Sequence, residues 1–334
     1  MKRFLPDTFT LMLVATVILA SLLPVSGAAA EYFGLATNLA IALLFFLHGA
    51  RLSRDVVLAG LLHWRLHLTI VLTTFAIFPL LGLLIGFVPS NILPPELYMG
   101  ILFLTVLPST VQSSIAFTSM AGGNVPAAIC AASGSNLFGM LLTPLLASLL
   151  LTTTGQAGFS ADALEKIALQ LLLPFVLGQV LEPWIGAWVR THKKILMPVD
   201  RGSILMVVYA AFSEAVIEGL WHTYSLANLG MVLIIDLALL AVVLCITMFG
   251  SRLLGFSKAD EIAITFCGSK KSLASGVPMA SAIFAGQNIG AIVLPLMIFH
   301  QVQLMICAVI AGRYARANEA SAVLAKADAQ NVTA

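Results

Sequence analysis

Two amines stand side by side between two hydroxyl groups in the run Ser269, Lys270, Lys271 and Ser272. A serine next to a lysine can act as a nucleophile with its base, which is the chemistry of Ser-Lys hydrolases. Successive helical residues diverge by about 100°, however, so neighbours on one helix make a poor dyad. The chain also has no GxSxG or HExxH motif. The sequence therefore predicts that the protein is not an enzyme.

The composition is that of a polytopic membrane protein. Of the 334 residues 60% are hydrophobic and 10% are charged, which is too apolar for a soluble domain. The first partner is therefore the lipid bilayer. A net charge of +2, with basic residues spread along the chain, argues against a nucleic-acid partner. The four cysteines show no CxxC spacing, so neither a metal site nor any cofactor other than a coupling ion is predicted.

Ten stretches are long and apolar enough to cross a bilayer core of about 30 Å. We take the first as an uncleaved helix rather than a signal peptide, because the repeat described below requires it. The predicted spans lie near residues 8–25, 31–50, 66–88, 97–121, 125–153, 162–189, 203–221, 226–251, 259–284 and 288–312.

The basic residues fix the orientation of these spans. All lysines and arginines except Lys166, Lys270 and Lys271 fall on one side, which the positive-inside rule identifies as cytoplasmic. Both termini are then cytoplasmic, and a bacterial inner membrane is the expected location. Residues 1–315 form one transmembrane domain, and residues 316–334 are expected to be a disordered polar tail. The two lysines of the opening run lie within the ninth span, near the middle of the membrane.

Five spans in each half indicate an inverted repeat, with repeat one at 1–155 and repeat two at 156–315. Both halves contain Ser-[Ile/Leu]-Ala, a Met-Ala pair and Gly-x-Asn before the next helix. Proline removes a backbone donor and glycine weakens a helix, so the fourth span of each half is expected to unwind. Irregular backbone at membrane depth must be buried or line a wet cavity, which points to a binding site. The predicted helix-break residues are Pro108, Gly268, Gly276 and Pro278.

These features resemble the bile acid:sodium symporter superfamily, most closely its bacterial branch. The resemblance extends to about residue 315 and rests on shared stretches at 46–55, 63–68, 116–124, 212–216, 266–276 and 295–301. It implies a panel of spans 1, 2, 6 and 7, a core of spans 3–5 and 8–10 with crossed helices 4 and 9, and a substrate bound between the two parts. It also implies secondary active transport of a small or amphipathic organic anion.

The resemblance also implies which positions correspond to the sodium ligands of sodium-dependent relatives. Ser113 and Ser114 match a polar pair on helix 4, and Asn124 matches the Asn that opens helix 5. The hydroxyl positions of helix 5 are occupied by alanines, with Ser133 nearby, and the acid of helix 9 is replaced by Phe266. An ammonium group repels sodium, so Lys270 and Lys271 make sodium coupling doubtful.

Each lysine at the bilayer centre costs about 2.5–3.5 kcal/mol, so the two charges need compensation. Three interpretations of the lysines remain open. An ammonium could fill the volume of a sodium ion, it could attract an anionic substrate, or it could snorkel to the interface. Proton coupling is a further option. For the first interpretation the expected partners are Gln112, Ser113, Ser114 and Asn124.

Glu214, deep in the seventh span, is a candidate for lining the cavity or carrying a proton. The alternatives to transport are a regulatory membrane protein that no longer transports and, less favoured, a Ser-Lys intramembrane hydrolase. Substrate identity, transport direction and oligomeric state cannot be read from the sequence.

Overall fold

All regular secondary structure in the described residues is helical, as predicted. The structure is a computed structural model that describes residues 8–51, 63–153, 168–217 and 219–332. The elements are α1 (Thr8–Leu22), α2 (Ala28–Arg51), α4 (Trp64–Leu72), η2 (Thr73–Ile77), α5 (Phe78–Ile85), α6 (Pro95–Val106), α7 (Gln112–Met120), α8 (Val125–Thr153), η3 (Ala168–Leu172), α10 (Leu173–Thr191), α11 (Lys193–Ile217), α12 (Leu220–Thr223), α13 (Leu226–Leu253), α14 (Lys258–Gly268), α15 (Leu273–Ile283) and α16 (Ile289–Val332).

Six helical stretches in the described part of the chain are long and apolar enough to cross a membrane. They are Ala28–Arg51, Trp64–Ile85, Val125–Leu150, Lys194–Ile217, Leu226–Leu253 and Ile289–Asn318. The 24 residues of α2 extend about 36 Å at 1.5 Å per residue, which exceeds a bilayer core of about 30 Å. Each predicted span coincides with a helix or with consecutive helical elements, although the start of the sixth lies outside the described residues.

The predicted fourth and ninth spans are each interrupted by a break, which leaves two helices in place of one, as expected from the sequence. Helix α6 ends at Val106 and α7 begins at Gln112, with Pro108 between them. Helix α14 ends at Gly268 and α15 begins at Leu273. Ser272 begins α15 as its N-cap, because its Oγ accepts from the Ser275 N–H.

Gly276 and Pro278 were expected to be break residues, but both lie inside α15. The Gly276 N–H donates to the Ser272 carbonyl at 2.9 Å, so the helix is regular there. A Cβ at position 276 would stand 2.5 Å from Leu107 Cδ1 and 2.6 Å from Leu296 Cδ2. The glycine therefore permits close helix packing, and the proline removes only one bond from a short helix.

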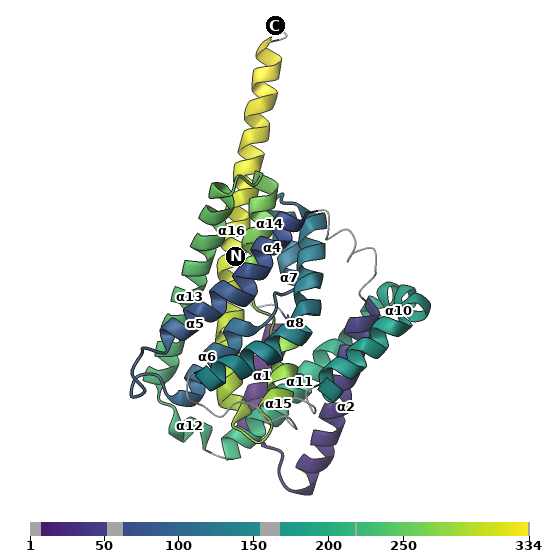
Figure 1. Cartoon of the computed structure of the whole chain (residues 1–334), viewed down its shortest axis with the longest axis vertical. Coiled ribbons are helices and arrows are strands. Elements are labelled where there is room, and N and C mark those ends of the chain that lie inside the picture. Colours follow the sequence, from purple (N-terminus) through teal and green to yellow (C-terminus); the bar gives the residue numbers. More distant parts are fainter. Residues whose placement is uncertain (1–7, 52–62, 154–167, 218, 333–334) are drawn as a thin grey trace.

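The helices form two groups (Figure 1). The four-helix group consists of α1, α2, α10 and α11, with α2 and α10 in contact along their length at one edge of the molecule. The larger group contains α4 to α8 and α13 to α16, with α5 and α13 at the opposite edge. Helix α11 joins the two groups through contacts with α15 and α16. The two breaks lie in the larger group.

The Gly-x-Asn sequences form equivalent turns in the two halves. Gly122 has a φ of 70° and Gly286 a φ of 81°, a region that favours glycine. Asn124 Oδ1 then accepts from the Ala127 N–H at the start of α8, and Asn288 Oδ1 accepts from Ala291 N–H in α16. The repeated sequence thus ends one helix and caps the next in each half.

The tail was expected to be disordered, but α16 continues to Val332 and projects beyond the other helices (Figure 1). The segment from Arg316 to Val332 contains six alanines and neither glycine nor proline. Alanine has the highest helix propensity, so nothing in this segment stops a helix that has already begun.

Candidate functional site at the helix crossing

The two breaks are hydrogen-bonded to each other. Ser272 donates its N–H to the Pro108 carbonyl at 2.9 Å, and Ser109 Oγ donates to the Cys267 carbonyl at 2.6 Å. All four residues are in or beside a break, and Ser109, Cys267 and Ser272 are buried. The breaks therefore meet at one buried point, which we call the helix crossing.

The first break leaves no carbonyl of residues 104–109 without a donor, as a buried backbone requires. Pro108 has no N–H, so the end of α6 depends on donors from elsewhere. The carbonyls of residues 104–109 accept, in chain order, from the Leu107 N–H, Lys271 Nζ, Thr143 Oγ1, Lys271 Nζ, the Ser272 N–H and Asn136 Nδ2.

Helix α8 contributes two polar side chains to the crossing. Ser135 Oγ accepts from the Ser109 N–H at 3.0 Å, and Asn136 Oδ1 accepts from Ser275 Oγ at 2.8 Å. Because Asn136 also donates to the Ser109 carbonyl, one side chain connects both broken helical pairs. Such interhelical bonds replace the hydrogen bonds that unwound backbone cannot make internally.

Gln303 of α16 holds the second break from the other side. Its Oε1 accepts from the Lys271 N–H at 2.9 Å and its Nε2 donates to the Lys271 carbonyl at 2.8 Å. The Gln303 amide therefore pairs with the backbone of Lys271 as a neighbouring strand would. This pairing fixes the position from which the lysine side chain extends.

The Lys271 ammonium is fully satisfied by three backbone carbonyls. Lys271 is 0% exposed, and its Nζ donates to the carbonyls of Thr74 at 2.8 Å, Thr105 at 2.7 Å and Leu107 at 2.7 Å. The Phe78 ring lies 4.1 Å from Nζ. Three donors meet three acceptors, and two of the acceptors lie at the negative end of α6. We call these three oxygens the carbonyl cage.

The Thr74 carbonyl is available because of a π-helical turn followed by a proline. In η2 the Phe78 N–H donates to the Thr73 carbonyl, five residues back. The next residue, Pro79, has no N–H for the Thr74 carbonyl. The helix thus leaves this carbonyl free for Lys271.

Lys270 is buried in a different environment. It is 0% exposed, and its Nζ makes no hydrogen bond to any described residue. The ammonium lies 3.9 Å from the centroid of the Phe117 ring and 5.7 Å from that of Phe266. The attraction of a cation to two aromatic faces is the main compensation that the described structure offers.

These placements differ from the expected partners of the lysines. Ser114 Oγ donates to the Phe266 carbonyl, while Ser113 Oγ is 2.8 Å from Thr110 Oγ1. Gln112 is exposed at the start of α7. Neither ammonium is hydrogen-bonded to any of these side chains in the described residues: Lys271 bonds to backbone carbonyls, and Lys270 lies against aromatic rings. The interpretation that a lysine snorkels to the interface is also wrong, because both lysines are fully buried.

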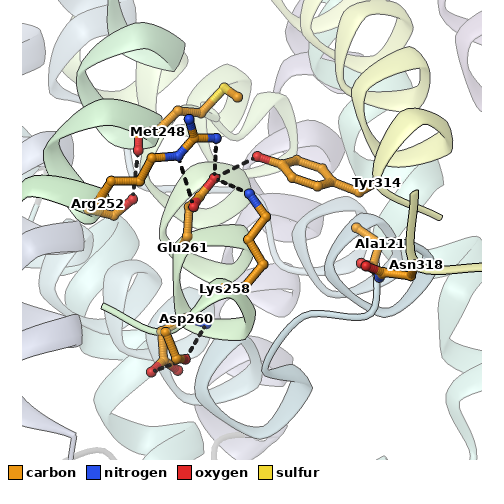
Figure 2. Close-up of polar contacts among 10 residues, drawn as sticks. Ala121, Met248, Arg252, Lys258, Asp260, Glu261, Tyr314 and Asn318 are labelled. Carbon is orange, nitrogen blue, oxygen red and sulfur yellow. Dashed lines mark hydrogen bonds and ion pairs between the residues drawn. The ribbon is translucent and has the colours of Figure 1, made fainter. Parts of the chain in front are cut away.

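Asn124 lies between α7 and α8 at one end of the larger group, and not at the crossing. It donates to Asp260 Oδ1 at 2.7 Å, close to an ion cluster centred on Glu261. Figure 2 shows the Glu261 carboxylate accepting from Arg252, Lys258 and Tyr314. These hydrogen bonds are 2.7–3.0 Å long. The cluster ties α13, α14 and α16 together and does not reach the lysines of the crossing.

The other predicted site residues are divided between the crossing and other parts of the structure. Ser269 Oγ donates to the Thr265 carbonyl at 2.6 Å, and Ser272 Oγ contacts Ser275, so the described hydrogen bonds do not assemble a Ser-Lys dyad. Ser133 is half-buried on α8, and Glu214 is exposed on α11. Of the predicted set, Pro108, Gly268, Ser114, Ser269, Ser272 and the two lysines are found at or beside the crossing.

Comparison with known proteins identifies the family. The SBF-like CPA transporter family matches residues 7–316. The chain belongs to this family. It is 60% identical over 327 residues to "Uncharacterized protein PA2026" of Pseudomonas aeruginosa, covering 97% of this chain and 98% of that protein. It is 53% identical over 320 residues to "Putative symporter YfeH" of Escherichia coli, covering 96% of each chain.

More distant relatives of this SBF-like chain include "Sodium/bile acid cotransporter 7" of Mus musculus. The identity is 29% over 278 residues, which is 81% of each chain. The expected resemblance is therefore confirmed. At the positions where that resemblance places sodium ligands, the SBF-like chain has Phe266 and two buried alanines, Ala128 and Ala132.

Sequence reasoning missed several residues of the crossing. Asn136 and Thr143 were not singled out, although a polar residue in an apolar helix is a signal of function. Pro79 was a signal for a freed carbonyl in span 3. The carbonyl cage itself has no side-chain signature, because its three ligands are backbone atoms.

Proposed function

We propose that the protein is a secondary active transporter of a small or amphipathic organic anion, working by alternating access around the helix crossing. The observation that carries the proposal is the direct bonding of two broken helical pairs at one buried point, Ser272 to Pro108 and Ser109 to Cys267, in a transporter family. Broken helices at matching repeat positions are typical of such transporters.

In this proposal ten spans form two inverted five-helix repeats in a bacterial inner membrane, with both termini cytoplasmic. The four-helix group is the panel and the larger group is the core. The limited contact between them, mainly from α11 to α15 and α16, supports relative movement of the two groups. A substrate would bind between them, with Glu214 on the panel side and Gln112, Ser113 and Ser133 on the core side as candidate contacts.

The coupling ion in this proposal is not sodium. Lys271 already places a cation on three carbonyls of the crossing, and Phe266 replaces a carboxylate with an apolar ring. A second cation close to a buried ammonium would be repelled strongly in a medium of low dielectric constant. The transport cycle would then run on the substrate gradient or on protons.

Counterflow in liposomes tests both parts of the proposal. Purified protein is reconstituted, vesicles are loaded with unlabelled taurocholate or benzoate, and uptake of the labelled anion is measured with and without sodium and pH gradients. We expect exchange above that of protein-free vesicles, and no stimulation by sodium. Absence of exchange with either anion would contradict organic-anion transport. Stimulation by sodium would instead contradict the assignment of the lysines.

A further inference from the structure

The carbonyl cage has the chemistry of a cation site. Its ligands are the backbone oxygens of Thr74, Thr105 and Leu107, all within 2.8 Å of one nitrogen. Carbonyl oxygens that replace a hydration shell are the usual ligands of dehydrated monovalent cations in membrane proteins. The fourth side faces the Phe78 ring, which also attracts a cation.

The cage oxygens are placed by the backbone of η2 and by the end of α6. Thr74 is freed by the η2 turn and Pro79, and the α6 carbonyls are freed by the end of the helix before Pro108. Lys271, for its part, is anchored through its backbone by Gln303. Oxygens and amine are therefore positioned by separate parts of the fold.

We propose that the carbonyl cage is a monovalent-cation site that the chain fills permanently with its own Lys271 ammonium. The ammonium is attached to the chain, and it satisfies the three carbonyl oxygens of the cage without an ion from solution. If the side chain is shortened, the cage is left with three unpaired oxygens and a void. A dissolved cation of matching size then binds there, and ammonium is the expected best fit because the oxygens already lie at N–H···O distance.

The inference rests on the crossing being the site of the proposed function, but its test needs no transport. Full-length Lys271→Ala is purified in detergent at neutral pH. Its thermal unfolding is followed in ammonium, potassium, sodium and N-methylglucamine chloride at equal ionic strength. We expect a saturable rise in melting temperature with ammonium, and a smaller one or none with N-methylglucamine. At ten times its Kd, the ion should lower the unfolding equilibrium constant about elevenfold.

Matched variants separate the cage from general salt effects. Lys271→Met fills the void without a charge, and Lys270→Ala removes the neighbouring buried amine, whose surroundings are aromatic rings. Both of these variants and the unmodified protein should show the same melting temperature in all four salts. An equal ammonium response in Lys270→Ala, or an equal response of Lys271→Ala to all four cations, would overturn the proposal.

A second variant keeps the proposal testable if Lys271→Ala does not fold. Lys271→Ser is, like Lys271→Ala, too short to fill the cage, so it should respond to ammonium in the same direction as Lys271→Ala. If both variants remain unfolded even when solubilised in high ammonium, the proposal is wrong, because the free ion should restore the missing charge. A positive ion response together with absent counterflow would refute only the transport proposal.

Discussion

Replacing Gln303 with leucine tests whether the crossing is held by its backbone bonds. The change removes both bonds to Lys271, at 2.9 and 2.8 Å, and leaves a buried N–H and a buried carbonyl without partners. An unsatisfied buried group costs roughly 1–3 kcal/mol, so the two amount to about 2–6 kcal/mol. Interhelical hydrogen bonds in membranes average only about 0.6 kcal/mol, because the unfolded reference finds other partners. We therefore expect a loss near the lower end, about 2–3 kcal/mol.

The same helix offers a matched control for this prediction. Gln301 is two residues away, and its Oε1 is buried with no hydrogen-bond partner among the residues that the structure describes. Gln301→Leu should leave stability unchanged or raise it slightly, because it removes an unsatisfied atom. Both variants are unfolded with increasing SDS in mixed micelles and followed by circular dichroism. Equal stability of the two variants would refute the view that Gln303 fixes the second break.

Two further substitutions test the buried contacts of the two helix groups. Lys270→Met should stabilise the protein by about 0.5–1.5 kcal/mol in the same SDS titration. It removes an insertion cost of about 2.5–3.5 kcal/mol and loses cation–π contacts of about 2 kcal/mol. A loss of stability would show that Lys270 has a partner in the folded protein. Gly178→Ala should destabilise the α2–α10 pair by about 1–3 kcal/mol, because its Cβ would clash with the Phe46 carbonyl. Gly34→Ala on α2 places its Cβ more than 4 Å from every described neighbour and should be close to neutral, and thermal melting compares the two variants.

The sequence was sufficient for those parts of the fold that depend on local chemistry. Apolar length predicted the helices, and Pro108 and Gly268 predicted where two of them are interrupted. The repeated Gly-x-Asn also marked where the next helix begins in each half, and the structure adds the positive φ of its glycine and the N-cap bond of its asparagine. Gly276 and Pro278 failed as break residues, because neighbouring helices and the Ser272 cap stabilise α15 around them.

The partners of the lysines could not be predicted, for a physical reason. Side-chain acceptors are the ones that a sequence makes visible, so the expected partners were Gln112, Ser113, Ser114 and Asn124. The acceptors of Lys271 are backbone carbonyls, whose availability depends on which donors the folded chain leaves unused. For Thr74 this depends on a π-helical turn, which no residue type marks on its own.

The two lysines, equivalent in the sequence, differ in how firmly the structure holds them. Lys271 makes three charge-assisted bonds, each worth about 1.5–3 kcal/mol, and its acceptors come from η2, α6 and the first break. Lys270 is held by ring contacts worth about 2 kcal/mol or a little more. Phe117 of α7 and Phe266 of α14 surround the amine of Lys270, whereas the acceptors of Lys271 lie on neither helix. Of the two adjacent amines, Lys271 is therefore the one that bonds the broken helices and η2 together.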